Sequence, residues 1–561
     1  MCGIFGCIGH GNLISETLNG LKILEYRGYD SAGVVYPTKQ GLKTIKSVGD
    51  IKQLSAKIST RPRTQICLGH TRWATNGGVC EANSHPHLSH DGKIAVVHNG
   101  IIQNYHACQA RLKQHHITLQ TDVDTEVIPN ILYLLQHNKH KIHDYLRGQY
   151  VFCALQHDKT DSLFLAKKGT LPLYIGKSAN QIFITSDTLA LPCSVNQIIT
   201  LDDLDTCEIT NQQINFFNQN KPVKKDWQPF NQTFIASDKN GFETFMAKEI
   251  HEIPAVITRL LHSYRHDPHL ISKITTFHQL LSRATCVHLC ACGTSYHAAL
   301  ILASLIESHL GIRAKAHISS EFTADTLLDD QNIAIVISQS GETADTLACM
   351  GILQQHHVPI VALCNVASST IAQKSGLCFP LLCGPEVAVA STKVFCASVL
   401  VGCLLINKFT DADLDALPQI AKQILNQAST LIPVPPKQPS KIFFIGKGLD
   451  YFLALESALK VKEVTYTHCE GYPANELKHG PLSMVDQQTL SIVYQSDTDN
   501  AVAEIGARGG RVITIPDPAP TNPLSFIAKI IPAQIFALDM ATKLGINPDR
   551  PRNLAKSVTV L

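Results

Sequence analysis

The chain has 561 residues, too many for one hydrophobic core, and its length suggests about three or four domains. With 45% hydrophobic and 17% charged residues it has the composition of a globular protein, not of a disordered or fibrous one. The formal net charge of +2 favours neither nucleic acid nor an acidic membrane surface as a partner.

Residues 395–406 form the longest apolar stretch, which is too short to span a bilayer and predicts a core helix. No basic-then-apolar segment opens the chain, so we expect a cytoplasmic protein. The 18 cysteines are scattered singly and predict buried, reduced thiols. Cys290 and Cys292 form a close pair without a second pair or flanking ligands, so no metal site is expected.

The chain opens Met1-Cys2-Gly3. If Met1 is removed, Cys2 carries a thiol and a free α-amine, and such an amine titrates at about pH 7.7–8.0. The amine can then act as general base for its own side-chain nucleophile. Composition alone explains Cys2 equally as a chance cysteine near a frayed terminus.

Residues 1–225 mix strand-like runs with helical patterns, which predicts an α+β layered domain. Strands are expected at residues 93–98 and 162–166, and Asn99-Gly100 is typical of a turn. Helices are expected at residues 14–25 and 125–136.

Beyond a polar stretch at residues 226–241, apolar strands alternate with helices, which is the doubly wound parallel α/β pattern. Strands are expected at 287–290, 333–337 and 360–363, and the pattern restarts at 441–446 after a proline-rich segment. Gln-Ser follows a strand in both parts, at Gln339 and again at Gln495, so we interpret the second part as a duplicate.

Two strand-to-helix turns of the first copy, residues 292–295 and 338–343, are rich in glycine and hydroxyl side chains. Glycine lets the backbone approach a ligand, and hydroxyls with helix N–H groups donate to anionic oxygens. No GxxxxGK[ST] motif supports a nucleoside triphosphate. The turns therefore favour a phosphate monoester, although a serine-rich turn by itself is commonly only a helix cap.

Six segments carry a family resemblance: Cys2-Gly3-Ile4, residues 24–33 (LEYRGYDSAG), 70–75 (HTRWAT), 98–102 (HNGII), 338–346 (SQSGETADT) and 551–560 (PRNLAKSVTV). Over essentially its whole length the chain resembles the isomerising glutamine–fructose-6-phosphate aminotransferases, or glucosamine-6-phosphate synthases. The resemblance implies an α+β N-terminal-nucleophile (Ntn) glutaminase domain followed by two α/β doubly wound sugar-isomerase (SIS) lobes. The expected limits are 1–225 for the class II glutaminase domain, 226–255 for a linker, 256–430 for the first lobe, 431–440 for a proline-rich joint, 441–550 for the second lobe and 551–561 for a C-terminal catalytic tail.

In the glutaminase half, the resemblance implies that Cys2 attacks the glutamine amide. Asn99 and the Gly100 N–H would form the oxyanion hole, where charge develops in the transition state. Arg72 would bind the glutamine carboxylate and Asp124 the ammonium. Taken singly, Arg72 or Asp124 is equally explained by a surface salt bridge.

In the sugar half, the resemblance implies a binding set for fructose 6-phosphate: Thr294, Ser295, Ser338, Gln339, Ser340, Thr343, Val389, Glu456, Lys460 and Ala555. Lys556 would form a Schiff base with the opened sugar, and Glu463 would move the proton between C1 and C2. His479 would open the ring and come from the partner subunit, so a homodimer or higher homo-oligomer is expected.

Glu456, Lys460 and Glu463 are spaced to share one helix face, a spacing that a structural salt-bridge ladder also uses. The family carries ammonia through an internal channel, with Trp73 in the glutamine site as its gate and Ala555 near its sugar end.

The implied substrates are glutamine and fructose 6-phosphate, and the implied products are glucosamine 6-phosphate and glutamate, without metal, nucleotide cofactor, nucleic acid or membrane. This is the first step of amino-sugar synthesis.

Four departures from the family pattern concern loop closure, gating and oligomer contacts, not catalytic groups: Asn76, Asn475, Leu561 and a short 495–508 segment.

Other enzymes begin with Cys-Gly-Ile, but the chain lacks the SGGxDS loop of asparagine synthetase and the acidic diphosphate-binding strand of amidophosphoribosyltransferase. Glutamate synthase would need a far longer chain. A phosphosugar-sensing binding protein with a vestigial glutaminase domain is the alternative from another class. Such a protein could dispense with Lys556, Glu463 and His479, yet all three are present.

Overall fold

The structure is a computed structural model, which describes residues 2–59, 61–74, 77–158, 162–210, 213–230, 239–323, 325–326, 328–367, 369–495 and 497–558. Met1, Asn76, Ser496 and Leu561 lie outside these residues. The chain divides into two compact units, residues 1–236 with 557–561, and residues 237–556. Each unit is described by itself.

The first unit is built on two antiparallel sheets. The first, in spatial order, contains β15 (Gln228–Pro229), β11 (Gln197–Thr200), β9 (Tyr174–Lys177), β10 (Gln181–Thr185), β1 (Gly3–Gly9), β4 (Ile66–Arg72), β2 (Ser31–Thr38) and β3 (Gly41–Val48). The second contains β14 (Lys221–Val223), β13 (Ile214–Asn218), β12 (Asp205–Thr210), β8 (Ser162–Lys168), β7 (Tyr150–Gln156), β6 (Ile94–Gly100) and β5 (His87–Leu88).

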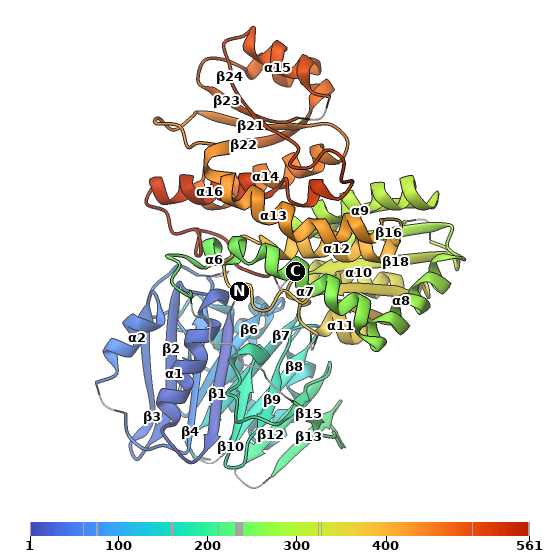
Figure 1. The fold of residues 1–561 in the computed structure, drawn as a ribbon. Helices are drawn as coiled ribbons and strands as arrows, with labels where there is room; N and C mark the ends of the chain where they lie inside the picture. Colours follow the sequence, from blue (N-terminus) through green and yellow to red (C-terminus); the bar gives the residue numbers. More distant parts are fainter. Residues whose placement is uncertain are drawn as a thin grey trace. The chain divides into compact units, whose positions relative to one another are not determined.

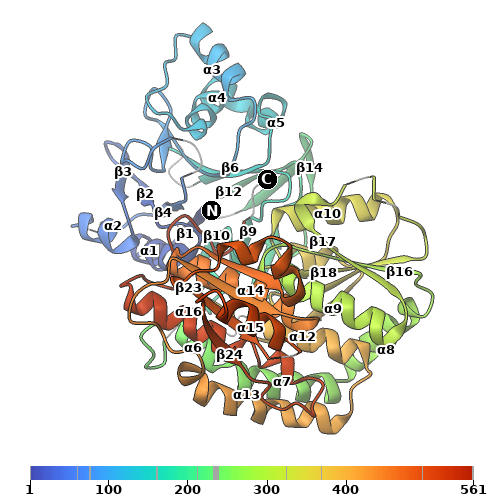
Figure 2. The same cartoon turned by 90° about the horizontal axis from the view of Figure 1, so that it is seen from above.

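Helices cover the outer face of each sheet, so the unit has four layers. Figure 2 shows α1 (Leu13–Leu24) and α2 (Ile51–Lys57) on one side of the unit and α3 (Tyr105–Gln114), α4 (Val127–Leu135) and α5 (Ile142–Tyr145) on the other. The alternation along β1 explains this arrangement: Ile4 and Ile8 face the core between the sheets, whereas Phe5 and Cys7 pack against the α1 layer. The predicted α+β layered domain is confirmed.

Asn99 and Gly100 do not form the predicted turn. They are the last two residues of β6 and pair with Val151 and Tyr150 of β7. Gly100 has φ +126°, and a Cβ there would lie 2.2 Å from the Gln149 carbonyl oxygen. Glycine is therefore required by a close backbone approach at the end of a strand, which the Asn-Gly pattern did not distinguish from a turn.

The second unit contains two parallel sheets (Figure 1). The four strands of the second sheet follow the same order as the first four strands of the first sheet. The first lobe has β17 (Arg313–Ile318), β16 (Cys286–Ala291), β18 (Asn332–Ser338), β19 (Ile360–Cys364) and β20 (Leu377–Pro380). The second lobe has β22 (Cys469–Pro473), β21 (Lys441–Gly446), β23 (Thr489–Tyr494) and β24 (Arg511–Ile515). In each lobe the first strand lies between the second and the third, which supports the predicted duplication.

The helices of the second unit are α6 (Phe245–His251), α7 (Ile253–His266), α8 (Pro268–Leu281), α9 (Thr294–Leu310), α10 (Ala344–Gln355), α11 (Thr370–Lys374), α12 (Lys393–Ile406), α13 (Asp411–Leu431), α14 (Leu449–Thr465), α15 (Asp499–Gly506) and α16 (Ile531–Lys543). Helices α9 and α14 follow the first strand of each lobe and both have 17 residues. Each starts after a glycine of nearly identical conformation, with φ 56° and ψ −129° at Gly293 and φ 60° and ψ −127° at Gly448.

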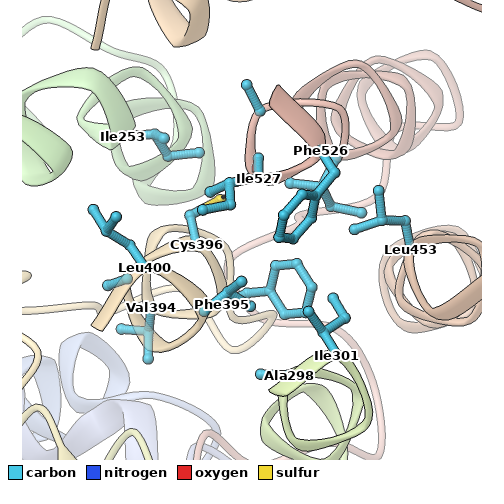
Figure 3. Packing of buried hydrophobic residues seen from close by; sticks show 14 of the residues in the cluster. Ile253, Ala298, Ile301, Val394, Phe395, Cys396, Leu400, Leu453, Phe526 and Ile527 are labelled. Atoms are coloured by element: carbon cyan, nitrogen blue, oxygen red, sulfur yellow. Dashed lines mark hydrogen bonds between the residues drawn. The ribbon is translucent and has the colours of Figure 1, made fainter. Parts of the chain in front are cut away.

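One hydrophobic core joins the two lobes. Figure 3 shows Phe395 of α12 pointing toward Ala298 and Ile301 of α9, with Phe526 of the short helix Ser525–Ile527 and Leu453 of α14 nearby. The predicted core helix at residues 395–406 is confirmed as α12. The segment Ser525–Lys543 is long and apolar enough to cross a membrane, but 89% of its most apolar window is buried in this core.

Truncating Phe395, which is 1% exposed, is expected to lower the unfolding free energy of the second unit. The Phe395→Ala change should remove about 3–5 kcal/mol, because it deletes a buried ring and leaves a cavity. Calorimetry of the full chain measures the loss. The matched change Ile271→Ala, at a side chain 44% exposed on α8, should shift it by less than about 0.5 kcal/mol. Equal shifts for both would contradict this packing.

The predicted domain limits remain predictions. β15, which falls within the predicted linker 226–255, pairs with β11 of the first unit. The predicted proline-rich joint 431–440 lies where α13 ends at Leu431 and β21 begins at Lys441.

Candidate active sites

Cys2 lies directly before β1, opposite the end of β4 in the first unit, since Gly3 pairs with Thr71. Its Sγ lies 3.4 Å from the Trp73 N–H, which donates to it, and 3.5 Å from the Trp73 carbonyl oxygen. Burial raises the pKa of the Cys2 thiol, whereas the Trp73 backbone and Arg72 lower it. The thiol thus needs a base to become a nucleophile.

Asn99 faces Cys2 from β6. Its Nδ2 donates to the Cys2 carbonyl oxygen at 3.1 Å, and its Oδ1 lies 3.0 Å from His70 Nε2. The same His70 nitrogen lies 2.9 Å from the His98 carbonyl oxygen, so it carries the proton and donates to both oxygens. Burial lowers the pKa of His70 to about 3, so the ring stays neutral. His70 thereby orients the Asn99 amide with its N–H groups toward Cys2.

Arg72 and Asp124 are both buried, at 2% and 7% exposure, so a surface salt bridge describes neither. The Arg72 guanidinium donates to the carbonyl oxygens of Gly77 and Gly78 at 3.2 and 3.3 Å. Asp124 Oδ2 accepts the Ile102 N–H at 2.8 Å, and burial raises its pKa. Both charges act on the Cys2 thiol, which places them around one site.

Replacing Asn99 by alanine is expected to lower kcat for glutamine hydrolysis by about 100- to 1,000-fold, with a smaller change in KM. The reason is that the lost N–H group serves charge that develops only in the transition state. Glutamate release measures the effect. The exposed Asn215 on β13 gives the matched control Asn215→Ala, which should keep the parental rate. A parental rate for Asn99→Ala would exclude the oxyanion role.

In the second unit, the two predicted anion-binding turns follow the neighbouring parallel strands β16 and β18. The chain runs from β16 to β17 on one side and then to β18 on the other, so the turns meet at a topological switch point, where α/β sheets bind ligands. Ser338 Oγ accepts the Gly341 N–H at 3.0 Å and lies 3.1 Å from Thr343 Oγ1. Ser340 Oγ accepts the Glu342 N–H at 3.2 Å. Ser295 and Gln339 are half-buried at the same turns.

Helix α14 places a charged cluster next to α9. Lys460 Nζ lies 2.6 Å from Glu463 Oε2 and 3.4 Å from Glu456 Oε1, and donates to Thr294 Oγ1 at 2.9 Å. Glu456 also accepts from Thr294 at 3.0 Å, and its second oxygen lies 2.7 Å from His297 Nδ1. Burial raises the pKa of Glu463, which suits a group that takes and returns a proton. The three charged residues of this helix face thus belong to a buried network that is bonded to the predicted anion-binding turn through Thr294.

Lys556 lies against the same cluster. Its Nζ is 2.6 Å from Glu386 Oε2, and the two side chains are 2% and 0% exposed. The charge of Lys556 lowers the pKa of Glu463, and that of Glu386 raises the pKa of Lys460, so these groups share one site. Val389 is buried in the loop after Glu386 and donates its N–H to the Asp549 carbonyl oxygen at 3.3 Å.

Two of the predicted site residues take no part in the hydrogen bonds and ion pairs described above. His479 is exposed at the end of the short helix Ala474–His479. Ala555 precedes Lys556 and is half-buried.

Two family descriptions match the chain. "Glutamine amidotransferase domain" matches residues 70–192, and "SIS domain" matches residues 280–408 and 437–542. The curated glutamine–fructose-6-phosphate aminotransferase (isomerizing) of Aquifex aeolicus is 34% identical over 600 residues, covering 100% of both chains. The enzyme of that name from Pseudomonas aeruginosa is 34% identical over 618 residues, again covering all of both chains. The chain belongs to the glutamine–fructose-6-phosphate aminotransferase (isomerizing) family.

Solved structures are similar to a little over half of the chain. The C-terminal domain of glucosamine-fructose-6-phosphate aminotransferase from Francisella tularensis is similar with a TM-score of 0.51 and 27% identity, covering 56% of this chain and 100% of that one. Glucosamine-6-phosphate deaminase from Thermotoga maritima has a TM-score of 0.50 at 24% identity, covering 57% and 100%, and shares the fold. The predicted Ntn glutaminase domain with two SIS lobes is therefore confirmed.

The sequence motifs of the aminotransferase family did not single out His70, His297 or Glu386. His70 lies within the HTRWAT segment, and His297 lies one turn into α9. Glu386 is a lone acid in the small-residue run from Gly384 to Ser391, which is the only signal that marks it in sequence.

Proposed function

We propose that the chain makes glucosamine 6-phosphate and glutamate from fructose 6-phosphate and glutamine, which accords with the name of its relatives, glutamine–fructose-6-phosphate aminotransferase (isomerizing). The observation that carries this proposal is that one chain holds the nucleophile of each half-reaction together with its neighbouring groups. Cys2 is faced by Asn99 in the first unit, and Lys556 is buried beside the α14 cluster in the second.

In the first unit, Arg72 and Asp124 bind the carboxylate and ammonium of glutamine, and Trp73 lines the site. The Cys2 thiol passes its proton to its α-amine and attacks the amide carbon. The oxyanion that forms is stabilised by Asn99 Nδ2 and the Gly100 N–H. The amine then protonates the leaving nitrogen, ammonia departs, and water cleaves the thioester to release glutamate.

In the second unit, the residues 292–295 and 338–343 with their hydroxyl and N–H donors hold the sugar phosphate. The donors are Thr294, Ser295, Ser338, Gln339, Ser340 and Thr343, with Val389 and Ala555 lining the sugar. Lys556 forms a Schiff base with the opened ketose, and ammonia displaces the Lys556 amine to leave an imine on C2. Glu463, held by Lys460, then moves a proton from C1 to C2 and gives the aldose.

The reaction requires no metal and no nucleotide. The exposure of His479 supports its assignment to the site of a partner subunit, where it opens the sugar ring, so we expect a homodimer or higher homo-oligomer. We also expect the enzyme to be cytoplasmic.

Incubating the purified chain with both substrates tests the proposal. Mass spectrometry should detect glucosamine 6-phosphate, and omitting either substrate should abolish it. Binding of fructose 6-phosphate without turnover, in protein shown by mass to lack Met1, would contradict the synthase and favour a phosphosugar sensor.

A further inference from the structure

A second buried carboxylate lies beside the Glu386–Lys556 pair. Glu249 is on α6 and is 1% exposed. Its Oε1 accepts the backbone N–H groups of Val387 and, at 3.3 Å, Ala388, which directly follow Glu386. Glu249 therefore holds the loop that carries both Glu386 and Val389.

The second carboxylate oxygen of Glu249, Oε2, indicates the protonation state of the side chain. Within the part of the chain that the structure describes, Oε2 is buried and has no hydrogen-bond partner. An ionised oxygen without a donor is strongly disfavoured in such surroundings, because nothing replaces the lost water. A protonated Oε2 carries no charge and is far better tolerated there.

Asp549 fixes α6 relative to the lysine tail. Its carboxylate accepts the N–H groups of Phe245 and Met246, both at 2.9 Å, at the start of α6. Its carbonyl oxygen accepts the Val389 N–H. Helix α6, the loop of residues 384–392 and the tail leading to Lys556 are thus tied into one support.

We propose that Glu249 is a positioning residue that sets the protonation state of Lys556, by remaining a neutral acid while Glu386 alone bonds the lysine as a carboxylate. The inference rests on the proposed Schiff-base role of Lys556. Glu249 bonds the loop backbone at Val387 and Ala388, and we assign it no contact with the substrate or the reacting atoms.

The proton balance of the step is as follows. The Lys556 ammonium gives one proton to the Glu386 carboxylate, and the neutral amine attacks the C2 carbonyl carbon. The carbonyl oxygen takes a second proton from the attacking nitrogen and becomes a hydroxyl. Glu386 then protonates this hydroxyl, which leaves as water, and the nitrogen lone pair forms the C=N⁺ bond of the Schiff base. Glu386 is again a carboxylate.

Charge explains why Glu249 must stay neutral. Burial and the negative charge of Glu386 raise the pKa of Glu249 to about 8, against the opposing effects of Lys556, the Val387 N–H and Lys393. Above this pH Glu249 ionises, and two carboxylates then favour the ammonium form of Lys556, which is no nucleophile. Below it, a single carboxylate faces the lysine.

The other charged groups around α6 have partners elsewhere. Lys393 Nζ donates to Glu252 Oε2 at 2.5 Å, and Glu252 Oε1 lies 3.7 Å from Lys248. On α16, which packs on α6, Asp539 accepts from Ser429 and Lys543 donates to the Pro435 carbonyl oxygen. His251 Nδ1 bonds the Ala247 carbonyl oxygen.

The experiment traps the Schiff base of fructose 6-phosphate with borohydride from about pH 6 to about pH 9.5, in the full chain and in Glu249→Gln. Mass spectrometry of the Lys556 peptide gives the trapping rate. Glutamine keeps an acceptor for the loop N–H groups but cannot ionise. The ratio of variant to parent rates is expected to be constant below about pH 7 and to rise about tenfold by pH 9.5. The exposed Glu243→Gln should give a constant ratio.

A second measurement keeps the test decisive if Glu249→Gln folds poorly, which calorimetry of the full chain reports. The trapping rate of the parent chain itself is expected to fall as the pH rises through about 8, because Glu249 ionises there. A pH-independent ratio for Glu249→Gln, or a parent trapping rate that does not fall above about pH 8, overturns the inference alone. Absence of any adduct on the parent Lys556 overturns the Schiff-base proposal and the inference with it.

Discussion

The Cys2→Ala chain is expected to release glutamate from glutamine at least about 1,000-fold more slowly than the parent, because the nucleophile is gone. Binding of glutamine should survive, since Arg72 and Asp124 are unchanged. The sugar half should also survive, so that borohydride still traps fructose 6-phosphate on Lys556. Glutamate release and trapping are measured on the same preparation.

A matched cysteine variant separates chemistry from folding. Cys193 is an exposed free thiol in the same unit, and Cys193→Ala should keep the parental glutaminase rate. Glutamate release by Cys2→Ala within tenfold of the parent would contradict the nucleophile assignment.

The Lys556→Arg chain is expected to lose glucosamine 6-phosphate formation by at least about 1,000-fold while keeping glutaminase activity. Arginine preserves a positive charge beside Glu386 but cannot form a Schiff base, because its guanidinium is always protonated. A loss of product formation would therefore show that the lysine amine is required, and not only the ion pair with Glu386.

The exposed Lys408 gives the control Lys408→Arg, which should be indistinguishable from the parent. Covalent trapping of the sugar should follow the same pattern, with no adduct in Lys556→Arg. An adduct on another residue at the parental rate would show that Lys556 is not the carbonyl partner.

The doubly wound half of the fold could be predicted because its signals are local. An apolar strand followed by a glycine- and hydroxyl-rich turn and a helix occurs in sequence in the first lobe, and the structure has β16 and β18 at the expected positions. The two glycines before α9 and α14 show the repeat in the backbone itself, with matching φ and ψ.

The structure also shows a difference between the lobes that accords with an anion site in the first lobe alone. Ser295 is the second residue of α9, whereas Asp450 is the second residue of α14. The Asp450 carboxylate accepts from Lys529 Nζ at 2.7 Å, so the helix N-terminus of the second lobe already has a carboxylate of the chain beside it. The sequence showed the missing hydroxyls but not this substitution of charge.

The residues that sequence reasoning missed act through long-range contacts. His70 of β4 in one sheet bonds Asn99 of β6 in the other sheet. Glu249 contacts the loop after Glu386 from a helix 137 residues earlier in the chain (386 − 249). A local sequence pattern cannot predict contacts between residues so far apart in the chain. Asn99-Gly100 failed as a turn for the same reason, since the close approach of Gln149 comes from a distant part of the chain.

Glutamine labelled with ¹⁵N in its side-chain amide tests the central claim, that one chain joins both chemistries, most directly. The parent chain with labelled glutamine and fructose 6-phosphate should yield glucosamine 6-phosphate carrying the label, together with unlabelled glutamate. Labelled ammonium and glutamate without any labelled amino sugar, or conversion of the sugar without nitrogen, would contradict the account.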